Sequence, residues 1–205
     1  MPILCLLAAL MFQQHMEHKF DPLESAKSFD DPARDAWQKP SEVIAALNLK
    51  PGQSVADIGA GTGYFTVRLA KSPAAPRVYA SDLEPGMVDY LRKRAAHEKL
   101  ANITAVQASA SSPNLPEPVD VILIVNTWHH IADRETYFKT LAKSLKPGGR
   151  LAIIDYVKGA PMGPPEHFRF APAQIRADLK KSGYKPAAEL TFLPNQQFQI
   201  FTLAK

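Results

Sequence analysis

The stretch from residue 55 to residue 66 constrains the fold most, and it reads VADIGAGTGYFT. An apolar strand leads into three alternating glycines and then into a helix-like segment. Gly59, Gly61 and Gly63 remove Cβ atoms where a tight turn forms and where a ligand lies against bare backbone. The helix that follows offers unpaired N–H groups. The segment therefore predicts a strand–turn–helix unit whose turn binds a nucleoside-bearing ligand.

The spacing of the glycines separates two kinds of nucleoside ligand. A dinucleotide fingerprint needs Gly-x-Gly-x-x-Gly or Ala. Counting from Gly59 puts Tyr64 at the third position, where its bulk would keep the helix from packing closely on the strand. Counting from Gly61 puts Thr66 there instead. A nicotinamide-dependent oxidoreductase is therefore disfavoured and is kept as an alternative.

Two further landmarks follow in order. Residues 77–82 read RVYASD, a short β-rich strand ending in Asp82. This carboxylate lies about twenty residues beyond the glycines, where an acid can accept both hydroxyls of a ribose. Residues 145–155 read LKPGGRLAIID, in which two glycines after a proline stop a helix and lead into an apolar strand. Each motif is common alone, but their order and helix-sized gaps together favour a cofactor-binding fold.

With these three motifs, the chain from about residue 41 onward resembles the class I S-adenosylmethionine-dependent methyltransferases. The first motif of that family is a strand, an acidic residue and Gly-x-Gly-x-Gly, which Asp57, Gly59, Gly61 and Gly63 match. The resemblance implies S-adenosylmethionine as the cofactor and methyl transfer as the reaction.

The resemblance also implies a set of cofactor-binding residues at the ends of the strands. They are Asp57, Gly59, Ala60, Gly61, Gly63, Asp82, Leu83, Ser109 and Asn126. In this interpretation the glycine turn contacts the amino-acid part of the cofactor, Asp57 organises the turn and Asp82 binds the ribose. The family usually has an acid after the third strand that reads adenine, whereas Ser109 here offers only an uncharged hydroxyl.

The remaining pattern predicts an α/β fold. Strands are expected near 53–58, 77–81, 102–107, 119–125 and 149–155, with helices near 63–71, 85–98 and 133–145 between them. A helix over 172–182 precedes strands over 187–193 and 197–203, and the short link between these strands forces an antiparallel pair. We expect a doubly wound, mostly parallel seven-stranded sheet with a C-terminal antiparallel hairpin. The resembling family has this hairpin, and a dinucleotide-binding half does not.

The N-terminal residues predict an extension over 1–40 before a methyltransferase domain over 41–205. Residues 13–40 are polar, interrupted by prolines and interpreted as irregular. The first helix is expected over 41–48, with Ser41 as its cap and Glu42 in its first turn. Residues 2–12 are apolar, shorter than the ~20 residues of a membrane span but within the range of a signal-peptide core. No basic residue precedes them, so we expect a cytoplasmic enzyme; export or membrane association through residues 1–12 is the alternative. The extension over 1–40 is a candidate lid or signal segment.

Composition excludes several classes of function. A chain of 205 residues suits one α/β domain plus an extension. The net charge of +4 includes one short basic run, residues 92–94, so no nucleic-acid partner is expected. Cys5 is the single cysteine, which excludes an internal disulfide and a cysteine-based metal site. No metal is expected, and the sequence does not indicate an oligomeric state.

Three histidines are the candidate catalytic residues. His129 and His130 follow the fourth predicted strand, and His167 lies with Arg169 and Phe170 in a proline-rich loop after the fifth. An imidazole has a suitable pKa for deprotonating an alcohol or phenol. Because positioning alone can supply about 7–11 kcal/mol to a displacement, a base is optional. The acceptor is unidentified; a small molecule is favoured, and a cofactor-binding module without turnover is the alternative.

Overall fold

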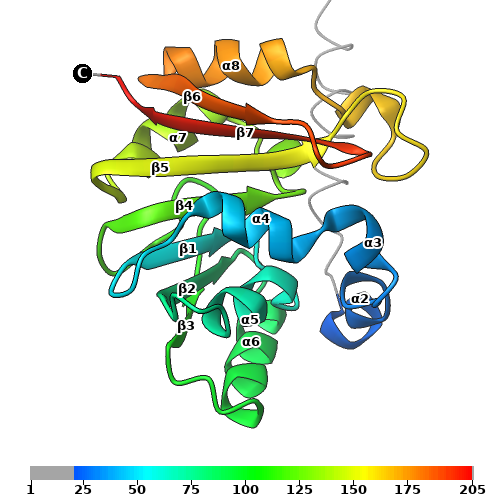
Figure 1. Cartoon of the computed structure of the whole chain (residues 1–205), viewed down its shortest axis with the longest axis vertical. Helices are drawn as coiled ribbons and strands as arrows, with labels where there is room; N and C mark the ends of the chain where they lie inside the picture. The colour runs from blue at the N-terminus through cyan, green and yellow to red at the C-terminus, as the bar shows by residue number, and fades with distance from the viewer. Residues whose placement is uncertain (1–20, 205) are drawn as a thin grey trace, which may run out of the picture.

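Seven strands form one mixed sheet with helices on both faces (Figure 1). The computed structural model describes residues 21–204, so the apolar stretch of residues 1–12 lies outside them. The strand order is β3-β2-β1-β4-β5-β7-β6. The strands are β1 (Ser54–Ile58), β2 (Arg77–Asp82), β3 (Ile103–Gln107), β4 (Val119–Val125), β5 (Leu145–Tyr156), β6 (Tyr184–Leu190) and β7 (Gln196–Leu203).

The first five strands are parallel, and β7 runs antiparallel to both β5 and β6. The predicted fold, including the C-terminal hairpin, is confirmed. Ile58 at the end of β1 aligns with Ser81 of β2 and Ile124 of β4. The carboxyl ends of these three strands therefore meet at one edge of the sheet, where ligands bind in open α/β folds.

Helices divide between the two faces of the sheet. Helices α4 (Pro40–Leu47) and α5 (Tyr64–Ala70) contribute to the buried cluster on one face, while α7 (Arg134–Ala142) and α8 (Pro172–Lys181) contribute to the cluster on the other. Helix α6 (Pro85–His97) packs on β2 and β3. No helix within residues 21–204 is both long and apolar enough to cross a bilayer.

The predicted boundaries differ from the structure around the Pro-Gly-Gly motif. Helix α7 is capped by Asp133, as its position suggested, but ends at Ala142 rather than near residue 145. Strand β5 already begins at Leu145, which pairs with Val119 before the glycines. The motif therefore bulges within β5, with Gly148 at φ +77°, and does not form the connection between helix and strand.

The N-terminal segment is helical where irregular structure was predicted. Helices α2 (Pro22–Phe29) and α3 (Arg34–Gln38) lie in it. Asp21 accepts hydrogen bonds from the first backbone N–H groups of α2, and a proline in the first turn removes a donor that would have no partner there. The prolines of this segment predict breaks in regular structure, whereas Pro22 lies in the first turn of α2.

The prediction that Ser41 caps the next helix is also wrong. Helix α4 begins one residue earlier, at Pro40. Its cap position is Lys39, which adopts a left-handed conformation with φ 45° and makes no side-chain capping bond. The fixed φ of proline suits the first helical position, and Pro40 occupies it. Ser41 therefore lies inside the helix and not at its cap.

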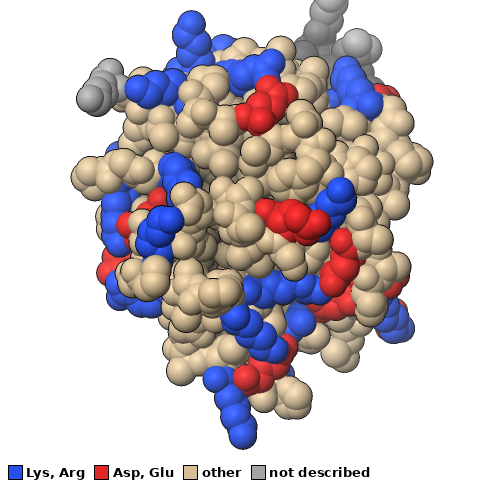
Figure 2. Space-filling model, in the orientation of Figure 1, with Lys and Arg blue, Asp and Glu red and all other residues tan. Residues whose placement is uncertain are grey.

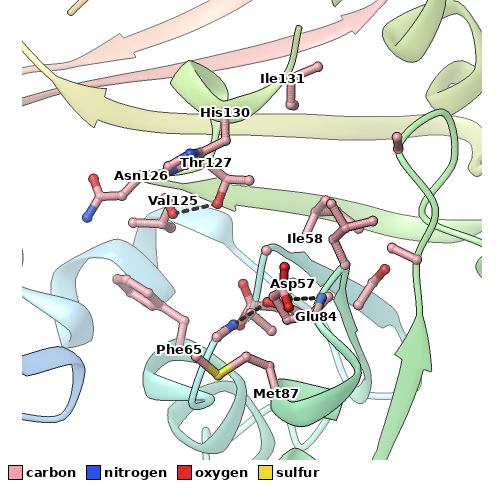
Figure 3. Close-up of a pocket in the computed structure, with 18 of the residues that line it drawn as sticks. Asp57, Ile58, Phe65, Glu84, Met87, Val125, Asn126, Thr127, His130 and Ile131 are labelled. Atoms are coloured by element: carbon pink, nitrogen blue, oxygen red, sulfur yellow. Dashed lines mark hydrogen bonds between the residues drawn. The ribbon is translucent and has the colours of Figure 1, made fainter. Parts of the chain in front are cut away.

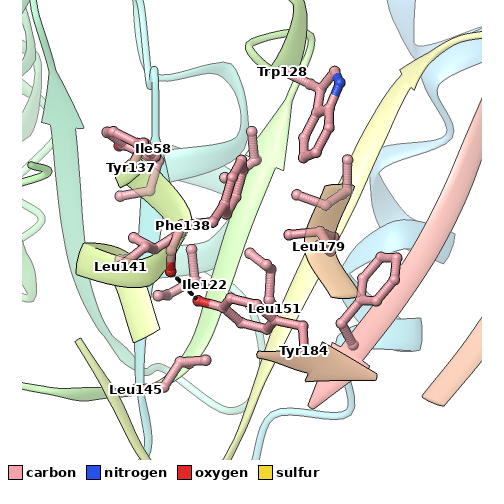
Figure 4. Packing of buried hydrophobic residues seen from close by; sticks show 14 of the residues in the cluster. Ile58, Ile122, Trp128, Tyr137, Phe138, Leu141, Leu145, Leu151, Leu179 and Tyr184 are labelled. Atoms are coloured by element: carbon pink, nitrogen blue, oxygen red, sulfur yellow. Dashed lines mark hydrogen bonds between the residues drawn. The ribbon is translucent and has the colours of Figure 1, made fainter. Parts of the chain in front are cut away.

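The core between the sheet and helices α7 and α8 combines aliphatic side chains with several packed aromatic rings (Figure 4). The Trp128 and Phe138 ring centroids lie 4.9 Å apart, and both side chains are fully buried. The hydroxyl of Tyr184, on β6, donates a hydrogen bond of 3.1 Å to the carbonyl oxygen of Phe138 (Figure 4). This bond attaches the edge strand of the hairpin to α7.

Replacing Tyr184 with phenylalanine tests this attachment. Tyr184→Phe removes the hydroxyl and leaves a buried carbonyl without that donor, so we expect the free energy of unfolding to fall by about 0.5–1.5 kcal/mol. Urea denaturation followed by circular dichroism measures this change. Tyr90→Phe on α6 is the matched control, since Tyr90 is only half-buried, and it is expected to be near neutral. Equal effects of the two substitutions would contradict the assignment.

Candidate functional site

A cavity of about 530 Å³ opens at the carboxyl ends of β1, β2 and β4 (Figure 3). Its walls come from the glycine turn after β1, the end of β2, the turn after β3, and the segment after β4. Helices α2 and α3 supply one more wall. Figure 3 shows Asn126, Thr127 and His130 across the cavity from Phe65 and Met87.

The glycine turn is shaped by a close approach to the segment after β4. Gly59 adopts φ +70°, and a Cβ atom there would lie 2.3 Å from the Thr127 Oγ1 atom. Glycine at this position is therefore required by Thr127 as well as by the backbone conformation. A Cβ on Gly61 would lie 3.3 Å from the Phe29 ring of α2. Gly63 faces Leu91 and lies outside the cavity lining.

Asp82 joins the end of β2 to the glycine turn. Its Oδ2 accepts the N–H of Gly61 at 2.7 Å, and its Oδ1 accepts the N–H of Glu84 at 2.9 Å. Burial raises the pKa of Asp82, and the donated N–H groups oppose part of that rise. The carboxylate lines the cavity and keeps further lone pairs for a ligand.

Asp57 makes its contacts with α5 rather than with the glycine turn. Its Oδ2 accepts a hydrogen bond of 2.7 Å from the Thr66 hydroxyl. Burial raises the pKa of Asp57 from 3.8 to about 6, since desolvation outweighs this hydrogen bond. The organising role expected of Asp57 is thus shared: Asp82 bonds the turn, and Asp57 anchors the helix that follows it.

The other predicted cofactor residues also line the cavity. Ala60, Leu83, Ser109 and Asn126 contribute to its walls. The Ser109 hydroxyl lies 3.3 Å from the Ser112 carbonyl oxygen, to which it donates within its own turn. Any adenine contact at Ser109 would compete with that bond.

Asn126 is the last member of a chain of side-chain amides. It adopts φ +56° at the end of β4. Gln38 of α3 donates to Gln196 of β7, and Gln196 donates to the Asn126 Oδ1 atom. The Arg34 guanidinium donates in turn to Gln38 Oε1 at 3.3 Å. The N-terminal helix, the last strand and the cavity wall are therefore connected through buried amides.

Arg34 and Thr62 line the cavity but were not among the predicted site residues. The Arg34 guanidinium lies 3.9 Å from the Tyr64 ring centroid, lines the cavity and has no carboxylate within ion-pair distance among residues 21–204. Burial lowers the pKa of Arg34. Thr62 also lines the cavity, and its buried hydroxyl has no hydrogen-bond partner among residues 21–204. Arg34 lies in the segment interpreted as irregular, so no sequence signal indicated it.

The candidate histidines lie in three different environments. Only His130 lines the cavity. His129 is turned toward β5, where its Nδ1 lies 3.0 Å from Asp155 Oδ2. His167 belongs to the short helix η2 (Glu166–Phe168), outside the cavity lining.

The two other residues of the loop after β5 also lie outside the cavity lining. Arg169 donates to two carbonyl oxygens of its own loop, and Phe170 packs on the Trp128 ring. Their contacts make them structural parts of this loop.

Neither a strongly charged surface field on the face shown in Figure 2 nor a cluster of metal ligands within residues 21–204 is present. Lys, Arg, Asp and Glu side chains are interspersed on the face shown in Figure 2, where neither blue nor red forms a continuous field. No cluster of histidine, cysteine, aspartate or glutamate within residues 21–204 has the geometry to hold a metal ion.

The known proteins that this chain resembles are named as methyltransferases. Residues 55–149 match the family model described as methyltransferase domain. Phosphoethanolamine N-methyltransferase 1 of Zea mays is 35% identical over 128 residues, which are 62% of this chain and 25% of the relative. Malonyl-[acyl-carrier protein] O-methyltransferase of Hahella chejuensis is 35% identical over 99 residues, covering 48% of this chain and 35% of that protein. The chain spans about a quarter of the length of the plant relatives it matches.

Solved structures extend the likeness beyond the matched motifs. A SAM dependent methyltransferase from Aquifex aeolicus superposes with a TM-score of 0.82 at 26% identity, covering 91% of this chain and 100% of that one. The glycopeptide N-methyltransferase MtfA complexed with (S)-adenosyl-L-methionine superposes with a TM-score of 0.68 at 16% identity, covering 81% and 87%, and shares the fold.

The close approach at Gly59 can be tested against a glycine of similar conformation. Gly183 adopts φ +85° and has open space where a Cβ would lie. Gly183→Ala is expected to cost about 1–2 kcal/mol of backbone strain. Gly59→Ala adds the clash with Thr127 and is expected to cost more, measured by thermal unfolding. A Gly59→Ala variant as stable as Gly183→Ala would contradict the close approach.

The raised pKa of Asp57 predicts a loss of stability with rising pH. The folded state binds this proton more tightly than the unfolded state, so stability falls between about pH 4 and pH 6, by up to about 3 kcal/mol. Asp57→Asn is expected to flatten this part of the profile in denaturant titrations at several pH values.

Asp120→Asn is the control with the opposite sign. Lys146 and Ser54 bond the Asp120 carboxylate, and the pKa of that group is lowered. Asp120→Asn should therefore remove stability that the native chain has above about pH 4 and loses on acidification. A steeper fall for Asp57→Asn than for the native chain would contradict the assignment to Asp57.

Proposed function

Because the chain belongs to the class I S-adenosylmethionine-dependent methyltransferases, we propose that it transfers a methyl group from this cofactor to a small-molecule acceptor. When bound, the cofactor supplies a methyl group on a positively charged sulfur, which is already an activated leaving group. The observation that carries the proposal is the cavity formed by the glycine turn, Asp82 and the end of β4. Holding the reacting atoms in line there can supply about 7–11 kcal/mol.

The nucleoside part of the cofactor fits the side of the cavity at β2. We propose that Asp82 accepts the ribose hydroxyls with lone pairs that Gly61 and Glu84 leave free. Leu83 and Ser109 line this side, which has no carboxylate in the turn after β3 to read the adenine amino group. Backbone groups of that turn are the proposed adenine contacts.

The amino-acid part fits the side of the cavity at α3 and α5. A carboxylate there would give the half-buried Arg34 guanidinium an anionic partner and the buried Thr62 hydroxyl an acceptor. Both residues line the cavity without such a partner among residues 21–204. We propose that Arg34 and Thr62 bind this carboxylate, while Asp57 favours the ammonium group electrostatically.

The N-terminal extension then contributes to the cofactor site. Phe29 of α2 lies over Gly61, and Arg34 of α3 stacks on Tyr64 at the start of α5. We propose that the described part of residues 1–40 covers the cofactor bound by the domain over residues 41–205. A cytoplasmic activity is proposed because S-adenosylmethionine is made inside cells.

Calorimetric titration with S-adenosylhomocysteine, NADH and NADPH tests the cofactor assignment. We expect binding of S-adenosylhomocysteine alone. Binding of a nicotinamide nucleotide in its place would overturn the proposal. Transfer of a labelled methyl group to a panel of small acceptors then separates an enzyme from a binding module without turnover.

Substitution of Arg34 tests the carboxylate site. Arg34→Met is expected to weaken S-adenosylhomocysteine binding by about 1.5–3 kcal/mol, the range for a hydrogen bond to a charged group. Binding of 5′-methylthioadenosine, which lacks the amino-acid part, should be unchanged. Arg68→Met is the matched control, since Arg68 lies 3.8 Å from the Tyr64 ring centroid but does not line the cavity. Equal weakening of both ligands by Arg34→Met would contradict the assignment.

A further inference from the structure

We propose that His129 is the general base of the transfer and that Asp155 holds it in the required tautomer. This inference rests on the proposed methyltransferase function and specifies its acceptor. The acceptor's nucleophile is a hydroxyl, phenol or amine group that loses a proton as it is methylated. Nucleophiles that carry no proton, such as thioethers, do not need such a base.

His129 and Asp155 form a buried pair at the carboxyl edge of the sheet. The His129 Nδ1 atom lies 3.1 Å from Asp155 Oδ1 and 3.0 Å from Asp155 Oδ2. The two side chains are 8% and 4% exposed. Asp155 Oδ1 also accepts the backbone N–H of Tyr156 at 2.7 Å. No arginine or lysine of residues 21–204 makes an ion pair with Asp155, so the imidazole is its principal partner.

This contact determines which nitrogen of His129 carries the proton. An ionised carboxylate only accepts hydrogen bonds, so Nδ1 must donate to Asp155. In the neutral ring the lone pair is then on Nε2. None of the residues from 21 to 204 forms a hydrogen bond with Nε2, and this atom is not among the buried polar atoms without a partner. Nε2 is therefore not sealed in the core, and in this tautomer its lone pair is available to accept a proton.

The position of His129 places this base beside the cavity. Asn126, Thr127 and His130 line the cavity within the same short segment after β4 (Figure 3). Trp128 points into the core, and the His129 ring centroid lies 4.2 Å from that of His130. The His129 side chain is not part of the cavity lining itself; it lies between the lining residue His130 and Asp155 of β5. His130 is exposed and His167 lies outside the lining, so neither shares the buried carboxylate partner.

The proposed step is balanced in atoms and charge. A lone pair of the acceptor's oxygen or nitrogen forms the new bond to the methyl carbon as the sulfur–carbon bond breaks. The bond electrons go to sulfur, which becomes the neutral thioether. The proton of the acceptor passes to His129 Nε2, and the imidazolium that forms is stabilised by the Asp155 carboxylate. The proton then leaves to water, and the ring returns to its starting tautomer.

Nitrogen-15 NMR of the histidine rings tests the tautomer directly. We expect the neutral His129 ring to carry its proton on Nδ1, with the signal assigned by comparison with His129→Gln. Asp155→Asn should redistribute this proton between the two nitrogens. A neutral native ring protonated on Nε2 would overturn the proposal. Titration with S-adenosylhomocysteine on the same samples separates the methyltransferase function from the role of His129. If the native chain does not bind this ligand, the methyltransferase function is contradicted. If it binds and His129 has the other tautomer, only the role of His129 is contradicted.

Methyl transfer gives the second readout. Labelled S-adenosylmethionine is offered with catechol and phosphoethanolamine, which lose a proton, and with dimethyl sulfide, which has none to lose. His129→Gln should lower transfer to any proton-bearing acceptor on the order of a hundredfold, the usual effect of a positioned base, while S-adenosylhomocysteine affinity stays unchanged. His130→Gln is the adjacent control and should have a smaller effect.

Added imidazole should restore part of the activity to His129→Ala. Transfer that persists in both His129 variants, or transfer to dimethyl sulfide alone, would overturn the proposal. The NMR measurement decides it even when no acceptor in the panel is methylated.

Discussion

The cavity depends on one hydrogen bond, from the N–H of Gly61 to the Asp82 carboxylate. This bond fixes the glycine turn of β1 to the end of β2, and the same turn bonds to the neighbouring backbone through Gly59 N–H and the Ser81 carbonyl oxygen at 2.8 Å. Because burial already raises the pKa of Asp82, the two backbone N–H groups that it accepts keep the carboxylate usable as an acceptor. Without this bond the turn would lack the shape that leaves space for a ligand.

Much of the fold follows from short sequence patterns. The alternation of apolar strands and helices predicted the sheet, and the link at residues 194–196 predicted the antiparallel hairpin, since so short a link cannot cross over. The boundary at Leu145 could not be predicted, because whether a Pro-Gly-Gly motif ends a helix or bulges within a strand depends on pairing with β4. Pairing of this kind is tertiary information and leaves no local signal.

The candidate site was predictable where backbone geometry demands a residue type. Gly59 and Asp82 stand at strand ends, and their residue types follow from turn shape and hydrogen bonding. Arg34 and Thr127 were not predictable in this way. Arg34 comes from a helix whose only fully buried residue is Gln38, and Thr127 matters through its contact with Gly59. A residue whose role arises from packing against a distant segment has no periodicity to indicate it.

The bond between Gln38 and Gln196 joins residues 158 positions apart, and β7 pairs between β5 and β6 in the finished sheet. Contacts of such long sequence separation form late, because the entropy of closing the loop must be lost before they stabilise anything. A chain emerging from the ribosome can pair β1 to β5 early, yet the wall that contains Asn126 lacks its amide partner until β7 has emerged. Ligand binding would then report that β7 has been made and has joined the sheet, since a chain that lacks β7 holds the glycine turn but leaves Asn126 without its amide partner.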